Sequence, residues 1–147
     1  MSEWRRGECT ISTDPLRIDL DVVHGYLSTS YWAAEIPREL VARSIANSVA
    51  FGIYHGAVQV GFSRVITDRA TFAYLADVFV LEEFRGRGLA RWMMEVIVAH
   101  PELQGLRRWM LATRDAHGLY RQHGFEPVAN PGALMQILRT DMYRSNK

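Results

Sequence analysis

The spacing of apolar and polar residues divides the chain into a helical N-terminal part, a strand-rich middle and an alternating C-terminal part. Acidic and apolar residues are mixed over residues 18–27, which predicts a short helix after a first strand. Residues 38–47 place Leu40, Val41, Ser44 and Ile45 on one face, which predicts a second helix. Pro37 disfavours helical geometry at the residue before it, so a loop should separate the two helices.

Three segments in the middle of the chain are rich in β-branched and aromatic residues. They cover residues 49–54, 58–66 and 71–81, and short turns containing glycine or aspartate separate them. Connections this short predict antiparallel neighbours. The third segment is apolar almost throughout, which is typical of a central strand that is covered on both faces.

The C-terminal half alternates between helical and extended patterns. Apolar residues at helical spacing predict a strong amphipathic helix over residues 89–97. A strand over 109–113, a short helix over 116–123 and a final pair of strands over 125–128 and 134–138 should follow. This order mixes hairpins with crossovers, so we expect an α/β (α+β) fold with a mixed sheet. The chain contains no repeat and no linker, which predicts a single domain over residues 1–147.

Composition and charge exclude several classes of partner. The 147 residues include 17 basic and 16 acidic ones, so bulk charge indicates neither nucleic acid nor a membrane. Arginines gather in the C-terminal half, but the aromatic signature and lysine runs of RNA-binding domains are missing. Cys9 is the only cysteine, and the N-terminus lacks the apolar core of a signal peptide, so we expect a cytoplasmic protein.

A glycine-rich turn, Arg85 to Ala90, lies between the third predicted strand and the amphipathic helix. Glycines there permit unusual backbone angles, and the start of the helix offers free N–H groups to an anion such as a pyrophosphate. The turn lacks the Gly-Lys-Ser/Thr triplet of a P-loop. It also carries Arg91 where a dinucleotide fingerprint needs its third glycine. A coenzyme A turn is the remaining alternative.

Two motifs at a fitting separation resemble the GNAT superfamily of N-acetyltransferases. The turn resembles the signature Arg/Gln-x-x-Gly-x-Gly/Ala, through Arg85, Gly88 and Ala90. Downstream, a second block resembles Asn-x-x-Ala-x-x-Leu-Tyr-x-x-x-Gly-Phe, with Thr113 in place of the asparagine; the matching residues are Ala116, Leu119, Tyr120, Gly124 and Phe125. The resemblance implies a GNAT fold, with a mixed, mostly antiparallel sheet of six to seven strands and about four flanking helices. It also implies acetyl-CoA as the cofactor and a homodimer as one oligomeric alternative.

The resemblance further implies which residues bind acetyl-CoA and act on it. The cofactor-binding residues would be Val78, Phe79, Val80, Arg85, Gly86, Arg87, Gly88, Leu89 and Ala90. Tyr120 would protonate the leaving thiolate, a role for which a phenol with a pKa near ~10 is suited. Its alternative is a core tyrosine.

Asp77 interrupts the apolar third strand, and an unpaired buried carboxylate is costly. It is therefore either held by structural hydrogen bonds or placed at the reaction centre. The segment YLADVFV resembles the corresponding strand of polyamine acetyltransferases, which carry a glutamate where this chain has Ala76. The candidates for the base are therefore Asp77 itself, His24 or a water chain. Without a base, the domain would be a non-catalytic acyl-CoA-binding module.

The acceptor, a small-molecule or peptide amine, would be bound around the predicted loop between the first two helices. His24, Tyr26, Tyr31 and Trp32 are the candidates, because aromatic rings can surround an aliphatic or cationic group. Their alternatives are core packing and, for His24, an ordinary surface position. No zincin-type spacing or nucleophile motif occurs, so neither a metal nor a covalent mechanism is indicated.

Overall fold

A six-stranded sheet organises the chain, and its strands lie in sequence order from β1 to β6. The structure is a computed structural model that describes residues 1–144. The strands are β1 (Glu3–Arg6), β2 (Cys9–Ser12), β3 (Val49–His55), β4 (Val58–Thr67), β5 (Phe72–Val80) and β6 (Arg108–Met110). The first five pair antiparallel, whereas β5 and β6 are parallel, so the predicted mixed sheet is confirmed.

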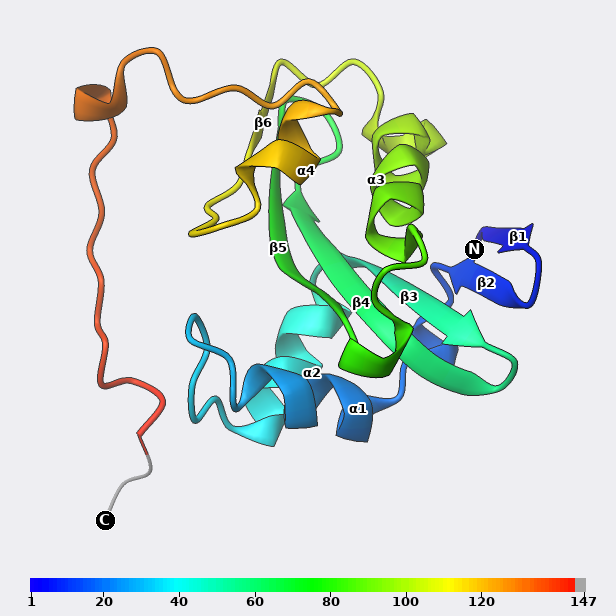
Figure 1. Cartoon of the computed structure of the whole chain (residues 1–147). Coiled ribbons are helices and arrows are strands. Elements are labelled where there is room, and N and C mark those ends of the chain that lie inside the picture. Colours follow the sequence, from blue (N-terminus) through cyan, green and yellow to red (C-terminus); the bar gives the residue numbers. More distant parts are fainter. Residues whose placement is uncertain (145–147) are drawn as a thin grey trace.

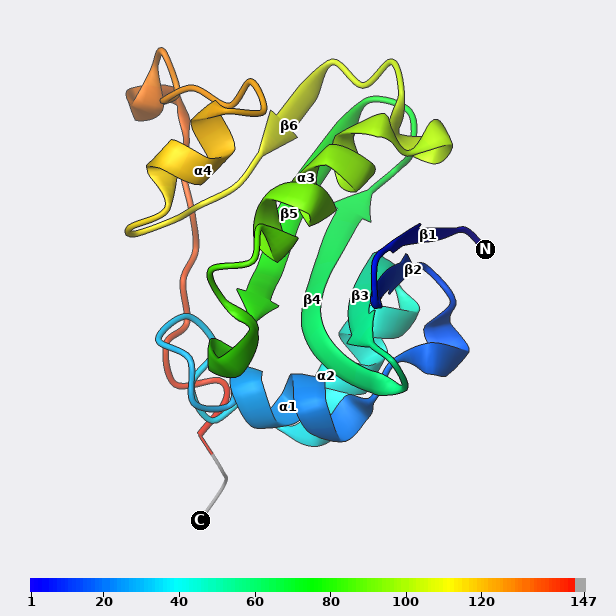
Figure 2. The same ribbon diagram turned by 45° about the vertical axis from the view of Figure 1, so that its right-hand side comes forward.

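Helices cover both faces of this sheet (Figures 1 and 2). The helices are α1 (Leu20–Leu27), α2 (Arg38–Ala46), α3 (Leu89–Ala99) and α4 (His117–Arg121). The apolar side of α3 packs with Phe51, Ile53 and Val65 in one core cluster. On the other face, α1 and α2 pack with Phe62 and Phe79 in a second cluster. None of the helices within residues 1–144 has the length and apolar character of a membrane span.

The start of the chain differs from the single strand that the sequence predicts. It forms a hairpin of β1 and β2 around Gly7, whose φ of 61° suits a tight turn. The first helix also begins later than predicted, at Leu20. The side chain of Asp19 accepts hydrogen bonds from the main-chain N–H groups of Asp21 and Val22, which fixes this residue as the N-cap.

The end of the chain corrects two predictions. β6 stops at Met110 rather than at residue 113, and neither residues 125–128 nor residues 134–138 form a strand. A short 3-10 turn at Pro131–Ala133 replaces the hairpin that would have joined the two predicted strands. Proline lacks an N–H and restricts the residue before it, so this position does not favour a continuous ladder.

The tail that follows runs apart from the sheet (Figure 1). Residues 134–138 therefore have the apolar pattern of a strand, but no strand within residues 1–144 pairs with them.

Two irregularities of β5 determine where a ligand can approach. Between the pairs Phe62–Phe79 and Arg64–Ala76, β5 contributes two residues where β4 contributes one, which is a β-bulge. On the other side, β6 pairs only with residues 72–74, so β5 has no ladder partner there from residue 75 to residue 80 within the described chain. The sheet opens at this point into a cleft.

Candidate active site

The cleft has a volume of about 1210 Å³ and lies between the open side of β5, the loop joining α1 and α2, and residues 111–116. It brings together most of the residues that the sequence predicts for the site. Those that line it are Tyr26, Tyr31, Trp32, Asp77, Val78, Phe79, Val80, Arg85, Ala90 and Tyr120. Segments from four parts of the chain therefore meet around one space.

The glycine turn has the backbone conformation that only glycine adopts readily. Gly86 and Gly88 have φ values of 80° and 77°. A Cβ added at either position would meet no atom within 4 Å, so the backbone angle, and not crowding, explains the glycines. Gly88 is the N-cap of α3 and supplies no side-chain hydrogen bond. The first N–H groups of the helix are thus open to an anion.

The two arginines of the turn differ in their contacts. Arg85 donates from Nε to the Val80 carbonyl at 2.9 Å and from Nη2 to the Tyr26 hydroxyl at 2.9 Å. It therefore links the end of β5 to α1. Arg87 is exposed, with its guanidinium 4.8 Å from the centre of the Phe84 ring. Its Nη2 also donates to the Glu83 carbonyl at 3.5 Å, so Arg87 contacts the segment just before the turn.

Asp77 occupies the bulge of β5 in a strained conformation. Its φ of 57° lies in the left-handed region, which is uncommon for a residue with a Cβ. Ser63 is the single residue of β4 opposite Asp77 and Val78. At a β-bulge the main chain locally leaves the regular hydrogen-bonded ladder with the neighbouring strand. Backbone N–H and C=O groups of β5 therefore face the cleft here.

The Asp77 carboxylate is engaged through both oxygens. Arg64 donates from Nε to Oδ2 at 2.6 Å, and the Trp32 indole N–H donates to Oδ1 at 2.8 Å. Arg64 also donates to the Ser48 hydroxyl at 3.2 Å. The Asp77 side chain is only 9% exposed, so this pairing offsets the cost of burying its charge. Asp77 thus lines the cleft and also ties the Trp32 loop to the bulge.

Tyr120 is a buried phenol at the boundary of the cleft. Burial, with smaller contributions from the nearby Tyr31 and Asp115, raises its pKa to about 12. The ring packs edge-on against Phe125 with their centres 6.0 Å apart. A phenol with this pKa is protonated at neutral pH and can act as a proton donor.

Aromatic rings line the side of the cleft formed by α1 and the α1–α2 loop. Tyr26 stacks on Phe79 with ring centres 4.0 Å apart, and Tyr31 meets Trp32 edge-on at 5.1 Å. The Arg114 guanidinium lies 3.8 Å from the centre of the Tyr31 ring. The main-chain N–H of Arg114 also donates to the Tyr31 hydroxyl at 3.3 Å. These contacts hold the α1–α2 loop against the segment after β6.

Some predicted residues lie outside the lining of the cleft. His24 is half-buried on α1, with Nε2 3.1 Å from the Ile36 carbonyl oxygen. Leu89 packs in the core beneath α3. Gly86, Arg87 and Gly88 follow Arg85 in the turn but are not among the lining residues.

Sequence reasoning missed other residues of the cleft. Among them are Arg64, Tyr74, Arg114, Asp115 and Tyr143. Arg64 carried a usable signal, because it is a charge within the otherwise apolar segment VGFSRVI and β4 is a neighbour of the strand that holds Asp77. Tyr143 carried none, since its position depends on the path of the tail.

Comparisons with known proteins show the family of the chain. Residues 46–127 match the family of acetyltransferase (GNAT) domains. A candidate acetyltransferase, FG08082 of Gibberella zeae, is 34% identical and covers 80% of this chain and 78% of its own. A solved structure from Xanthomonas campestris pv. campestris, described as a candidate GNAT-family acetyltransferase, is 48% identical. It superposes with a TM-score of 0.90 and covers 93% of this chain and 97% of its own.

A third solved structure, a predicted acetyltransferase of Clostridium acetobutylicum with acetyl-CoA, is only 12% identical. It has a TM-score of 0.65 and covers 88% of this chain and 96% of its own, so it shows a shared fold. The motifs of the sequence, the open edge of β5 and the family match lead to one conclusion. The chain belongs to the GNAT family of acetyltransferases.

Proposed function

We propose that the protein transfers an acetyl group from acetyl-CoA to a primary amine, by direct attack in a ternary complex. One observation carries this proposal: a single cleft joins the bulge of β5, the two ends of the glycine turn before α3 (Arg85 and Ala90) and the buried phenol of Tyr120. The three features have separate functions in such a reaction. The bulge would polarise a carbonyl group, the glycine turn would bind an anion, and Tyr120 would donate a proton.

The residues present fit a coenzyme A thioester. The unpaired side of β5 offers main-chain groups at residues 78–80 to the amides of an extended arm. The open N–H groups at the start of α3 suit a pyrophosphate, and Arg87 supplies a positive charge beside them. Acetyl-CoA would bring the acetyl group as a thioester.

The chain's own groups would act at two atoms of the reactants. A main-chain N–H of Val78 to Val80, exposed by the bulge, would donate to the carbonyl oxygen on which negative charge develops during attack. Tyr120 would protonate the departing sulfur, and its high pKa keeps the proton available at neutral pH. Both groups are held on ordered elements of the fold.

The proton of the acceptor amine requires a base. Asp77 is the candidate carboxylate, but Arg64 and Trp32 occupy both of its oxygens. We therefore propose that Asp77 holds the bulge of β5 and the α1–α2 loop in place. Water in the open cleft would remove the proton of the amine. With water as the base, no ionisable side chain is needed at position 76, where this chain has Ala76.

A thiol-release assay with acetyl-CoA and a panel of amines tests the proposal. The panel should include small amines, amino acids, peptides with a free N-terminus and aminoglycosides. We expect acceptor-dependent release of coenzyme A and an acceptor product heavier by one acetyl group in mass spectrometry.

The second candidate is a non-catalytic acyl-CoA-binding domain, favoured by Ala76 and by the engaged Asp77 carboxylate. Calorimetry separates the two candidates. Tight binding of acetyl-CoA together with no thiol release across the panel would support the binding module and contradict the enzyme.

A further inference from the structure

Arg114 is the arginine of the cleft whose guanidinium is free. Within residues 1–144 this guanidinium has no hydrogen-bond acceptor and no ion pair, and its contact is with an aromatic ring. The other two arginines that line the cleft are engaged. Arg64 pairs with Asp77, and Arg85 donates to a main-chain carbonyl and to a tyrosine hydroxyl. The N–H groups of Arg114 are therefore available to a bound molecule.

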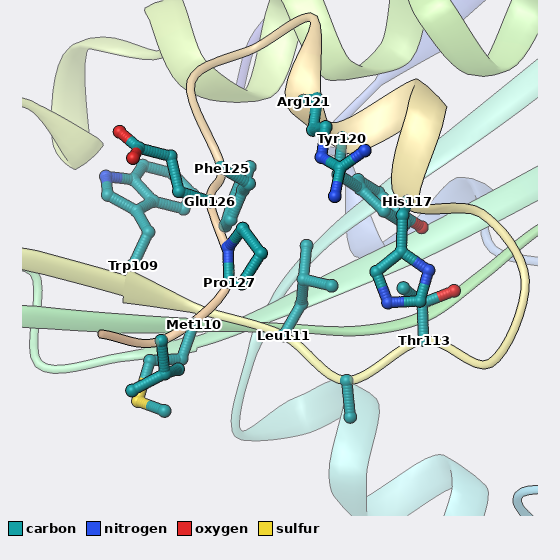
Figure 3. Close-up of a pocket in the computed structure, with 12 residues that line it drawn as sticks. Trp109, Met110, Leu111, Thr113, His117, Tyr120, Arg121, Phe125, Glu126 and Pro127 are labelled. Carbon is teal, nitrogen blue, oxygen red and sulfur yellow. The ribbon is translucent and has the colours of Figure 1, made fainter. Parts of the chain in front are cut away.

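Arg114 faces the cleft and not the neighbouring cavity. It lies in the loop between β6 and α4, which Figure 3 shows between Thr113 and His117. Thr113 and His117 line a second cavity, with a volume of about 290 Å³ (Figure 3). Arg114 lies between these two residues in the chain but lines the cleft alone. Its charge therefore acts on whatever the cleft binds.

Tyr31 fixes the direction of the Arg114 guanidinium. The central carbon of the guanidinium lies 3.8 Å from the centre of the Tyr31 ring, which is van der Waals contact. The main-chain N–H of Arg114 also donates to the Tyr31 hydroxyl at 3.3 Å. A guanidinium that rests on a ring face keeps its N–H groups free at its edge, in the fork that matches a carboxylate or a phosphate. Arg114 is thus oriented in advance for an anionic group.

Two aromatic side chains connect Arg114 to the bulge of β5. The Tyr31 ring meets the Trp32 ring edge-on, with centres 5.1 Å apart. The Trp32 indole N–H in turn donates to Asp77 at 2.8 Å. All four residues line the cleft. A molecule that lies along these two rings would have one end beside the bulge and the other end beside the guanidinium.

The ionisable side chains of the cleft have a positive balance. Those that line it are three arginines and two aspartates, namely Arg64, Arg85, Arg114, Asp77 and Asp115. The ion pair of Arg64 with Asp77 cancels one charge of each sign. Arg85 and Arg114 then remain against Asp115. A cleft with this balance favours an acceptor that carries negative charge and disfavours a polycation.

We propose that the acceptor is an amine with an anionic group, a carboxylate or a phosphate, at the end opposite the amine, and that Arg114 binds this group. The inference rests on the proposed function and names the substrate class of the same site. The amine would lie at the bulge of β5, and the spacer would pack on Tyr31 and Trp32. The anionic group would accept hydrogen bonds from the edge of the guanidinium. Arg114 would therefore determine specificity.

A series of amines that differ only in the charge of the far end tests the proposal. 6-Aminohexanoate and 6-aminohexyl phosphate carry an anion, 6-aminohexanamide is neutral, and 1,6-diaminohexane carries a second cation. We expect kcat/KM for the anionic amines to exceed that for the amide by about tenfold or more, with the diamine poorest. Comparison of the two anions distinguishes carboxylate from phosphate. A second series with a four-carbon spacer covers a shorter separation.

Variants of Arg114 assign the preference to this residue. Arg114→Gln should abolish the preference for the anionic amines over the amide. Arg114→Lys keeps the charge but loses the planar fork, so it should retain only part of the preference. The matched control is Arg43→Gln, which removes an exposed arginine of α2 outside the cleft. This control should keep the preference of the wild type.

Calorimetry with the same amines in the presence of free coenzyme A measures binding without transfer. Anion-selective binding that is lost in Arg114→Gln would support the proposal even without thiol release, in which case the proposed transfer alone fails. Transfer to all amines of the series at equal rates, or fastest to the diamine, would overturn the anionic acceptor and leave the transfer standing. An anion preference that persists in Arg114→Gln, or no binding of either anion, would overturn the inference too.

Discussion

Arg64 of β4 and Asp77 of β5 form an ion pair at the bulge of β5, with Nε and Oδ2 2.6 Å apart. Asp77 is one of three non-glycine residues in residues 1–144 with positive φ, and it lies within a strand. Backbone strain of this kind persists only when surrounding contacts fix it. The ion pair and the Trp32 indole provide those contacts, so the same carboxylate holds both the bulge of β5 and the α1–α2 loop, which line the cleft.

Asp77→Asn separates a positioning role from that of a base. The amide keeps the size of the side chain but loses the ion pair with Arg64, so stability should fall by about 2 kcal/mol. We expect the acceptor KM to rise while the shape of the pH profile of kcat/KM is unchanged. A fall in kcat of about 100-fold or more, together with loss of the acidic limb of that profile, would show instead that Asp77 is the base.

Tyr120→Phe should reduce kcat for thiol release by about 100-fold or more, because the sulfur would leave without its proton donor. The dissociation constant of acetyl-CoA should be unchanged in calorimetry. The matched control is Tyr54→Phe, since Tyr54 is also buried with a pKa of about 12 but lies outside the cleft. If both variants keep the wild-type rate, the acid role of Tyr120 is excluded.

Gly88→Ala should weaken acetyl-CoA binding by placing a Cβ and a strained backbone at the start of α3. The φ of 77° makes alanine unfavourable by about 1 kcal/mol. Gly56→Ala is the control, because Gly56 has a φ of 61° and equally open surroundings in the turn between β3 and β4. Both variants should lose similar stability in urea, and only Gly88→Ala should raise the dissociation constant. If the two variants bind acetyl-CoA with equal affinity, the glycine turn is not part of the cofactor site.

Alkaline pH should destabilise the fold through two phenols. Burial raises the pKa of Tyr54 and of Tyr120 to about 12, from an ordinary value of 10.0. Between these two values the unfolded chain ionises while the folded chain does not, so the free energy of unfolding declines as pH rises from about 10 to about 12. Urea unfolding across this range should show the decline, and either Tyr→Phe change should reduce its slope. A free energy of unfolding that stays constant across this pH range in the wild type would contradict the raised pKa values of the two tyrosines.

Sequence patterns predicted the elements of the fold whose formation depends on residues close to one another in the chain. The apolar spacing of residues 89–97 located α3, and the β-branched segments located β3, β4 and β5. The Arg85–Ala90 turn and the Tyr120 block indicated the family because each motif is short and its spacing is fixed. The cleft confirms that the turn's first arginine, Asp77 and Tyr120 lie around one space.

The features that sequence reasoning missed depend on contacts distant in the chain. The engagement of Asp77 requires Arg64 on a neighbouring strand and Trp32 from a loop 45 residues earlier. The strand pattern of residues 134–138 was recognised, but no local rule states whether such a segment pairs within its own chain. Its partner, and thus its structure, is decided by the edge that is available to it.

If acetyl-CoA binds as proposed, the unpaired side of β5 would link the supply of acetyl-CoA to the lifetime of the protein. A ligand that completes a sheet binds only the folded chain, so it contributes to the free energy of unfolding by mass action, about 2.7 kcal/mol at a concentration 100 times its dissociation constant. A cell short of acetyl donor would then hold a less stable form, which proteases degrade faster. Abundance of the enzyme would follow the metabolic state without any dedicated regulator.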